Sequence, residues 1–137
     1  MHIHGQTLGN ALRSQAKAQA QSMRNQIREQ LVPAVAQYLP IESVWVFGSV
    51  ARNEPSTNSD ADVLLMLTAE IDEKTVFRSI RKALRDADLS FSCDVIAWTP
   101  KGYADRSSSQ IAFFTEIMKE RILLWESTNN RQNQYAG

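Results

Sequence analysis

Residues 44–67 read VWVFGSVARNEPSTNSDADVLLML, and this stretch decides how the chain folds. Its first part, Val44–Phe47, is apolar and predicts a β-strand. Gly48–Ser49 opens a tight turn, and a polar loop rich in Asn, Ser and Pro follows it. A second strand is expected over about Ala61–Leu67. The stretch therefore predicts two strands whose connecting turn and loop carry most of its polar side chains.

Two carboxylates stand at the start of the second strand. Strand side chains alternate between the faces of a sheet, so Asp60 and Asp62 point to the same side. Like charges this close repel each other unless a cation lies between them, and Mg²⁺ takes carboxylate and phosphate oxygens as ligands. Gly48 lets the backbone approach a ligand, and Ser49 adds a hydroxyl beside amide donors at an expected helix start. The two carboxylates and the turn together predict a site that binds phosphate with the help of a metal ion.

A third carboxylate is expected beside this pair. Apolar positions at helical spacing predict a helix over Asp72–Asp86, and the apolar run that follows predicts a third strand over Ser90–Trp98. A helical crossover places its two strands next to each other or nearly so. Asp94, a charged residue amid this largely apolar strand, is therefore expected to lie beside Asp60 and Asp62.

Two linked motifs in the stretch resemble a known signature. G-S-x-A-R at residues 48–52 and S-D-x-D at residues 59–62 are similar to the signature of the DNA polymerase beta-like nucleotidyltransferase superfamily. At this length the chain most resembles the minimal nucleotidyltransferase (MNT) branch, the antitoxin partners of HEPN toxins. The resemblance covers roughly residues 30–126. Many relatives have Gly after the motif's Arg, whereas this chain has Asn53, which tolerates the left-handed backbone conformation almost as well.

The resemblance implies roles for six residues. Those that bind the nucleotide, ATP, are Gly48, Ser49 and Arg52. Those that hold a two-metal Mg²⁺ site and carry catalysis are Asp60, Asp62 and Asp94. From the residues alone, a structural role for Arg52 is an equally good interpretation: it could cap a helix or form an ion pair with Glu54 or an aspartate.

The resemblance also implies a reaction and a partner. The protein would transfer AMP from ATP to a hydroxyl, by family analogy a tyrosine, of a cognate HEPN toxin and so neutralise it, forming a hetero-oligomer. Two alternatives stay open. One is a non-catalytic antitoxin that acts by binding and occlusion. The other is a small-molecule nucleotidyltransferase of the aminoglycoside type, although those enzymes normally carry an additional helical domain for the acceptor.

The expected fold is α/β or α+β: a small mixed sheet with helices mainly on one face, in a single domain over residues 1–137. Residues 1–30 are expected to form an N-terminal helical extension, residues 31–126 the catalytic core, and residues 127–137 a flexible tail. Within the core we expect helix over Lys101–Arg121, broken around Arg106–Ser109 with a serine capping its second part, and a short closing strand over Ile122–Trp125.

Composition excludes several classes of protein. The chain has 137 residues, a formal net charge of zero and 43% hydrophobic residues, which suit one globular domain. No apolar run reaches the roughly 18 residues of a membrane span, and the N-terminus lacks the apolar core of a secretory signal. The neutral charge gives no track for direct nucleic-acid binding. The single cysteine, Cys93, fits a reducing cytoplasm and is expected to be buried.

Overall fold

The computed structural model describes residues 4–55, 60–109 and 111–128. Four strands form one sheet in the order β3-β2-β1-β4. The strands are β1 (Ile41–Phe47), β2 (Ala61–Leu67), β3 (Cys93–Trp98) and β4 (Ile122–Glu126). β1 is antiparallel to both β2 and β4, whereas β2 and β3 run parallel. The sheet is therefore mixed, as predicted.

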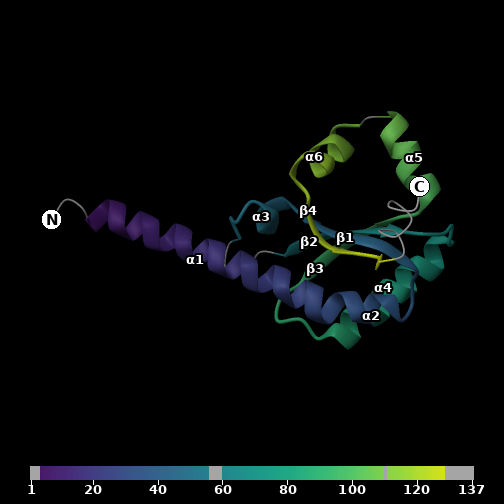
Figure 1. Ribbon diagram of the computed structural model, residues 1–137, viewed down its shortest axis with the longest axis horizontal. Helices are drawn as coiled ribbons and strands as arrows, with labels where there is room; N and C mark the ends of the chain where they lie inside the picture. The colour runs from purple at the N-terminus through teal and green to yellow at the C-terminus, as the bar shows by residue number, and fades with distance from the viewer. Residues whose placement is uncertain (1–3, 56–59, 110, 129–137) are drawn as a thin grey trace.

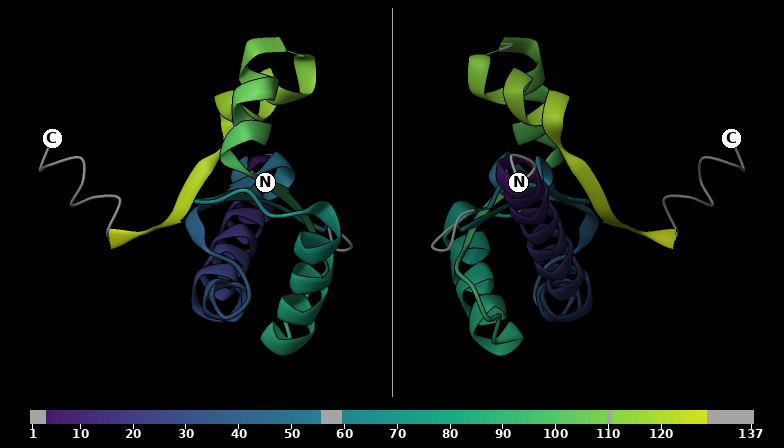
Figure 2. Two further views of the ribbon diagram at one scale, coloured as in Figure 1. Left: turned by 90° about the vertical axis from the view of Figure 1, so that its right-hand side faces the viewer. Right: turned by 90° about the vertical axis from the view of Figure 1, so that its left-hand side faces the viewer.

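The longer helices cover one face of this sheet. They are α1 (His4–Gln26), continued by the π-helical segment η1 (Ile27–Leu31) and by α2 (Val32–Ala36), and α4 (Glu73–Ala87). The shorter helices α5 (Pro100–Ser109) and α6 (Ala112–Glu120) lie against the other face (Figures 1 and 2). One further turn of helix, α3 (Gly48–Ala51), follows β1 directly.

The hydrophobic core lies on both sides of the sheet because β2 is buried on both. Val63 and Leu65 are fully buried on the side of α1, η1, α2 and α4, with Ile27 and Leu31 packed there too. Leu64 is fully buried on the opposite side. The cluster on that side consists of Phe47, Leu64, Trp98, Phe114 and Ile117. Even-numbered residues of β2, including Asp62, therefore face α5 and α6.

Helix α1 extends well beyond the body of the domain (Figure 1). Among the described side chains of α1, the buried residues begin at Ala20, and Met23 is buried one turn later. Nearer the N-terminus, Leu8 is 62% exposed and Leu12 is 56% exposed. None of the described helices is both long enough and apolar enough to cross a lipid bilayer. The first half of α1 therefore presents leucines that this domain does not cover.

Some local expectations from the sequence are corrected. The predicted serine cap is wrong: Ser107–Ser109 lie inside α5, and α6 begins after Ile111, whose side chain makes no capping hydrogen bond. A hydrogen bond from the Ser109 hydroxyl back to the carbonyl of Arg106, 3.1 Å long, shows how the serine serves the preceding helix instead. Cys93 is only partly buried, because β3 is an edge strand. The expected tail lies mostly outside the described residues.

Candidate nucleotide site

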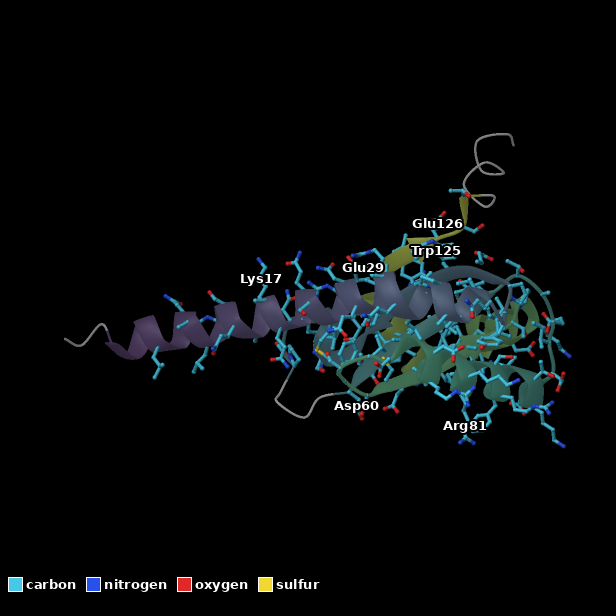
Figure 3. All side chains as sticks on the ribbon, turned by 90° about the horizontal axis from the view of Figure 1, so that it is seen from below. Lys17, Glu29, Asp60, Arg81, Trp125 and Glu126 are labelled. Carbon is cyan, nitrogen blue, oxygen red and sulfur yellow. The ribbon has the colours of Figure 1, made fainter. Side chains whose placement is uncertain are left out.

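Two of the three predicted carboxylates are direct neighbours in the sheet. Asp62 and Asp94 are register partners in the parallel pair formed by β2 and β3, so both side chains leave the sheet on the side of α6. Asp60 precedes β2 and is exposed; Figure 3 shows its side chain pointing away from the ribbon. Period-2 alternation and the helical crossover thus bring these aspartates to one end of the sheet.

The turn after β1 comes unusually close to one of these carboxylates. Gly48 has a φ of +71°, a conformation that side chains with a Cβ rarely adopt. A Cβ built on Gly48 would lie 2.4 Å from Oδ2 of Asp62, well inside van der Waals contact. Glycine is therefore required here for two reasons: its positive φ, and the space that a Cβ would take from the Asp62 carboxylate.

The carboxylates interact unfavourably with one another. Partial burial and the nearby negative charges of Asp94 and Asp60 raise the pKa of Asp62 above its ordinary value. Burial, together with these three aspartates, raises the pKa of the Cys93 thiol to about 12, so the thiol is protonated at neutral pH. A cation would relieve this repulsion, and a donor set made only of oxygens suits a hard cation such as Mg²⁺.

The carboxylates do not form a finished metal cluster. Among the residues that the structure describes, no three His, Cys, Asp or Glu side chains are grouped closely enough to hold a metal ion as they stand. Asp62 and Asp94 fit a cation by their chemistry and register, and Asp60 is close enough to raise the pKa of Asp62. The metal-binding role of all three remains a prediction from the sequence.

A glutamate that the sequence did not single out occupies this site. Oε1 of Glu120, the last residue of α6, accepts a hydrogen bond of 2.9 Å from the backbone N–H of Gly48. Its Oε2 lies 2.9 Å from Nη1 of Arg52, whose Nε also donates to Glu54 over 3.3 Å. These two hydrogen bonds raise the pKa of Arg52, and the bond to Glu120 has the larger effect. The expected pairing of Arg52 with Glu54 is therefore present, together with a second partner.

A pocket of about 440 Å³ opens beside the carboxylates. The sheet and α6 each contribute both carboxylates and apolar side chains to its lining, among them Phe113, which is 55% exposed. Its lining residues are Phe47, Gly48, Asp62, Asp94, Ile96, Phe113, Glu116, Ile117 and Glu120. Ser49, Arg52 and Asp60 lie outside this lining. The pocket therefore combines oxygen ligands with a surface on which a flat ring can pack.

The first helix supports the turn from behind. Nη1 of Arg24 on α1 donates to the carbonyl of Val50 over 2.8 Å and to Oδ1 of Asn53 over 2.9 Å. Asn53 has a φ of 60°, so the left-handed conformation expected of this residue is confirmed. Sequence reasoning missed Arg24 because its partners are 26 and 29 residues away. The turn is thus clamped between α1 and α6.

Comparison with known proteins identifies the family. Residues 29–130 match the family described as polymerase beta, nucleotidyltransferase. No curated protein sequence matches the chain. Among solved structures, a protein assigned as a nucleotidyltransferase from Sulfolobus solfataricus superposes with a TM-score of 0.56 at 19% identity, covering 82% of this chain and 89% of its own.

Two toxin–antitoxin structures have a similar fold. The structure of a toxin–antitoxin with AMP-PNP gives a TM-score of 0.55 at 14% identity and covers 77% of each chain. A mutant of the toxin–antitoxin MntA-HpeT gives a TM-score of 0.51 at 11% identity, covering 77% of this chain and 78% of its own. At these identities the likeness concerns the fold alone. With most of its length matched by the family, this chain belongs to the polymerase beta nucleotidyltransferases.

Proposed function

We propose that this protein is a Mg²⁺-dependent adenylyltransferase that transfers AMP from ATP to a hydroxyl group of a protein partner. The observation that carries the proposal is the registered pair Asp62 and Asp94 beside the Gly48 turn, in a chain of this family. Asp60, Asp62 and Asp94 would hold the metal. When bound, Mg²⁺ would stabilise negative charge on the attacking and leaving oxygens of an in-line displacement.

The chain's own residues have separate tasks in this proposal. The turn at Gly48 and Ser49 receives the phosphates, since its backbone can approach a ligand closely. Arg52 neutralises phosphate charge once it leaves its glutamate partners. Asp94, which is more exposed than Asp62, accepts the proton of the incoming hydroxyl. The acceptor oxygen then bonds to the α-phosphorus, and pyrophosphate leaves.

The acceptor that we propose is a tyrosine on a helical partner of the HEPN class, and the modification neutralises it. Two structures of similar fold are toxin–antitoxin proteins, one of them with AMP-PNP. The projecting half of α1 offers Leu8 and Leu12 to such a partner. A bound partner would hold its hydroxyl in line with the α-phosphate, and positioning of this kind supplies a large part of the rate in many transfers.

The test is a mass measurement on the partner. The product of the neighbouring gene is incubated with the purified protein, ATP and Mg²⁺, and its intact mass is recorded. We expect a gain of one or more AMP groups, lost with Asp62→Asn because that change removes a ligand charge. A stable complex without any mass gain would contradict transfer and favour neutralisation by binding and occlusion.

A further inference from the structure

The carboxylate of Glu120 binds two of the groups to which the proposed function assigns the nucleotide's phosphates. Its two oxygens bind separate partners, the Gly48 N–H at 2.9 Å and the Arg52 guanidinium at 2.9 Å. A backbone N–H donates one strong hydrogen bond, so it cannot serve Glu120 and a phosphate oxygen at the same time. The side chain of Glu120 is 23% exposed, which leaves it open to exchange with solvent or a ligand.

The position of Glu120 in its own helix makes a local explanation weak. It is the last residue of α6, where the helix dipole disfavours a negative charge. Its stabilisation comes instead from the turn after β1, 72 residues earlier in the chain. The carboxylate is thus placed by a long-range contact with the site rather than by the needs of α6.

The charges around the site would make the Glu120 contacts oppose the binding of a polyanion such as a triphosphate. Four carboxylates and no lysine or arginine belong to the described residues that line the pocket. Arg52, the cation that the proposed function assigns to the phosphates, is paired with both Glu120 and Glu54. A triphosphate entering this acidic region would therefore compete with Glu120 and Glu54 for the charge of Arg52.

We infer that Glu120 is an internal competitor of the nucleotide: in the free protein its carboxylate occupies the Gly48 and Arg52 contacts, and nucleotide binding displaces it. This inference rests on the proposed function, because it concerns the same phosphate site. It adds a step to the proposed reaction, because the Glu120 carboxylate must leave these two contacts before the nucleotide can use them. The free protein therefore binds nucleotide more weakly than the same site would if the Glu120 carboxylate did not compete for its hydrogen-bond donors.

Titration calorimetry with AMP-PNP and Mg²⁺ tests this on the full chain. Glu120→Gln keeps the shape of the side chain but removes its charge and its ion pair with Arg52. We expect it to bind between about threefold and tenfold more tightly than the wild type, as loss of one partly screened competing pair implies. Thermal denaturation of the same sample confirms that the variant is folded.

The matched control is Glu116→Gln. Glu116 lies one turn earlier on α6 and lines the same pocket, but its side chain forms no hydrogen bond or ion pair with the described residues. We expect a smaller gain from it than from Glu120→Gln. Equal gains in affinity from both variants would show that only the loss of a negative charge near the pocket matters. Weaker binding by Glu120→Gln would show that Glu120 stabilises the turn for nucleotide binding. Either result overturns the inference.

A measurement on the wild type removes any dependence on the variants. The ¹³C resonance of the Glu120 carboxyl should move toward that of a solvent-exposed glutamate when AMP-PNP and Mg²⁺ are added. If nucleotide binds and this resonance stays in place, the carboxylate is not displaced and the inference fails. If the wild type and both variants bind no nucleotide at all, the proposed function itself fails, and the inference with it.

Discussion

Asp62 carries an electrostatic cost in the protein without metal. Burial and the charges of Asp94 and Asp60 raise its pKa on folding, so the folded state binds protons more readily than the unfolded state does. The resulting loss of stability is absent below the unfolded pKa, near 3.8, and fully present above the raised folded pKa. Ionised Asp62 therefore destabilises the metal-free fold at neutral pH.

Replacing this carboxylate by an amide removes the cost. We predict that Asp62→Asn increases the free energy of unfolding at pH 7 without Mg²⁺, and that the increase shrinks toward pH 4. Urea denaturation at the two pH values measures it, with Asp105→Asn on the exposed surface of α5 as the control. A lower stability of Asp62→Asn at pH 7 would show that the carboxylate is stabilised by contacts other than those seen here.

Single residues of the site differ in how far the sequence could predict them. The placement of Asp62 and Asp94 followed from strand periodicity and from the handful of topologies that a helical crossover allows. Gly48 could be expected at a tight turn, but not its contact with Asp62. Glu120 left one weak signal, an acidic residue at the end of a predicted helix, and its partners lie too far away in the sequence for any local pattern to reveal them.

Among the elements, α1 and the turn after β1 depend on each other through Arg24. Arg24→Ala would leave the carbonyl of Val50 and the side chain of Asn53 without this donor. We predict a loss of about 1–3 kcal/mol in the free energy of unfolding, the usual cost of an unsatisfied, partly buried hydrogen-bonding group. Nucleotide affinity should fall as well, because the turn loses its support.

The matched control for this change lies on the same helix. Lys17 is exposed, on the projecting part of α1, and Lys17→Ala should alter the free energy of unfolding by less than about 0.5 kcal/mol (Figure 3). Chemical denaturation compares the two. Equal small effects from both substitutions would contradict a structural role for Arg24.

The elements themselves were largely predictable where apolar patterns are strong. The observed β2 has the predicted limits, and the apolar run over residues 63–67 is the pattern that indicated it. β1 begins earlier than predicted, at Ile41, and the polar residue Ser43 is buried within it. The boundary between α5 and α6 was predicted too early in the chain. A serine can cap the start of one helix or bond back to a carbonyl at the end of the preceding helix, and the packing of the two helices decides between these roles.

At the scale of the whole molecule, the site lies where three parts of the chain meet. The sheet supplies Asp62 and Asp94, the turn supplies Gly48 and Arg52, and α6 closes over them with Glu120. The opposite face of the sheet carries the longer helices, from which α1 projects away from the body (Figure 1). In the proposed function, the catalytic groups lie on the α6 side of the sheet, and α1, which offers leucines to a partner, contacts the turn of the site through Arg24.

The central claim is that these carboxylates and this turn bind a nucleotide together with Mg²⁺, and thermal denaturation tests it most directly. With AMP-PNP about a hundredfold above its dissociation constant and millimolar Mg²⁺, wild-type protein should gain about 2.7 kcal/mol, a rise of several degrees in Tm. The rise should need both ligands and vanish in the Asp60→Asn, Asp62→Asn double variant. An unchanged Tm for the wild type, or the same rise in the double variant, would contradict the claim.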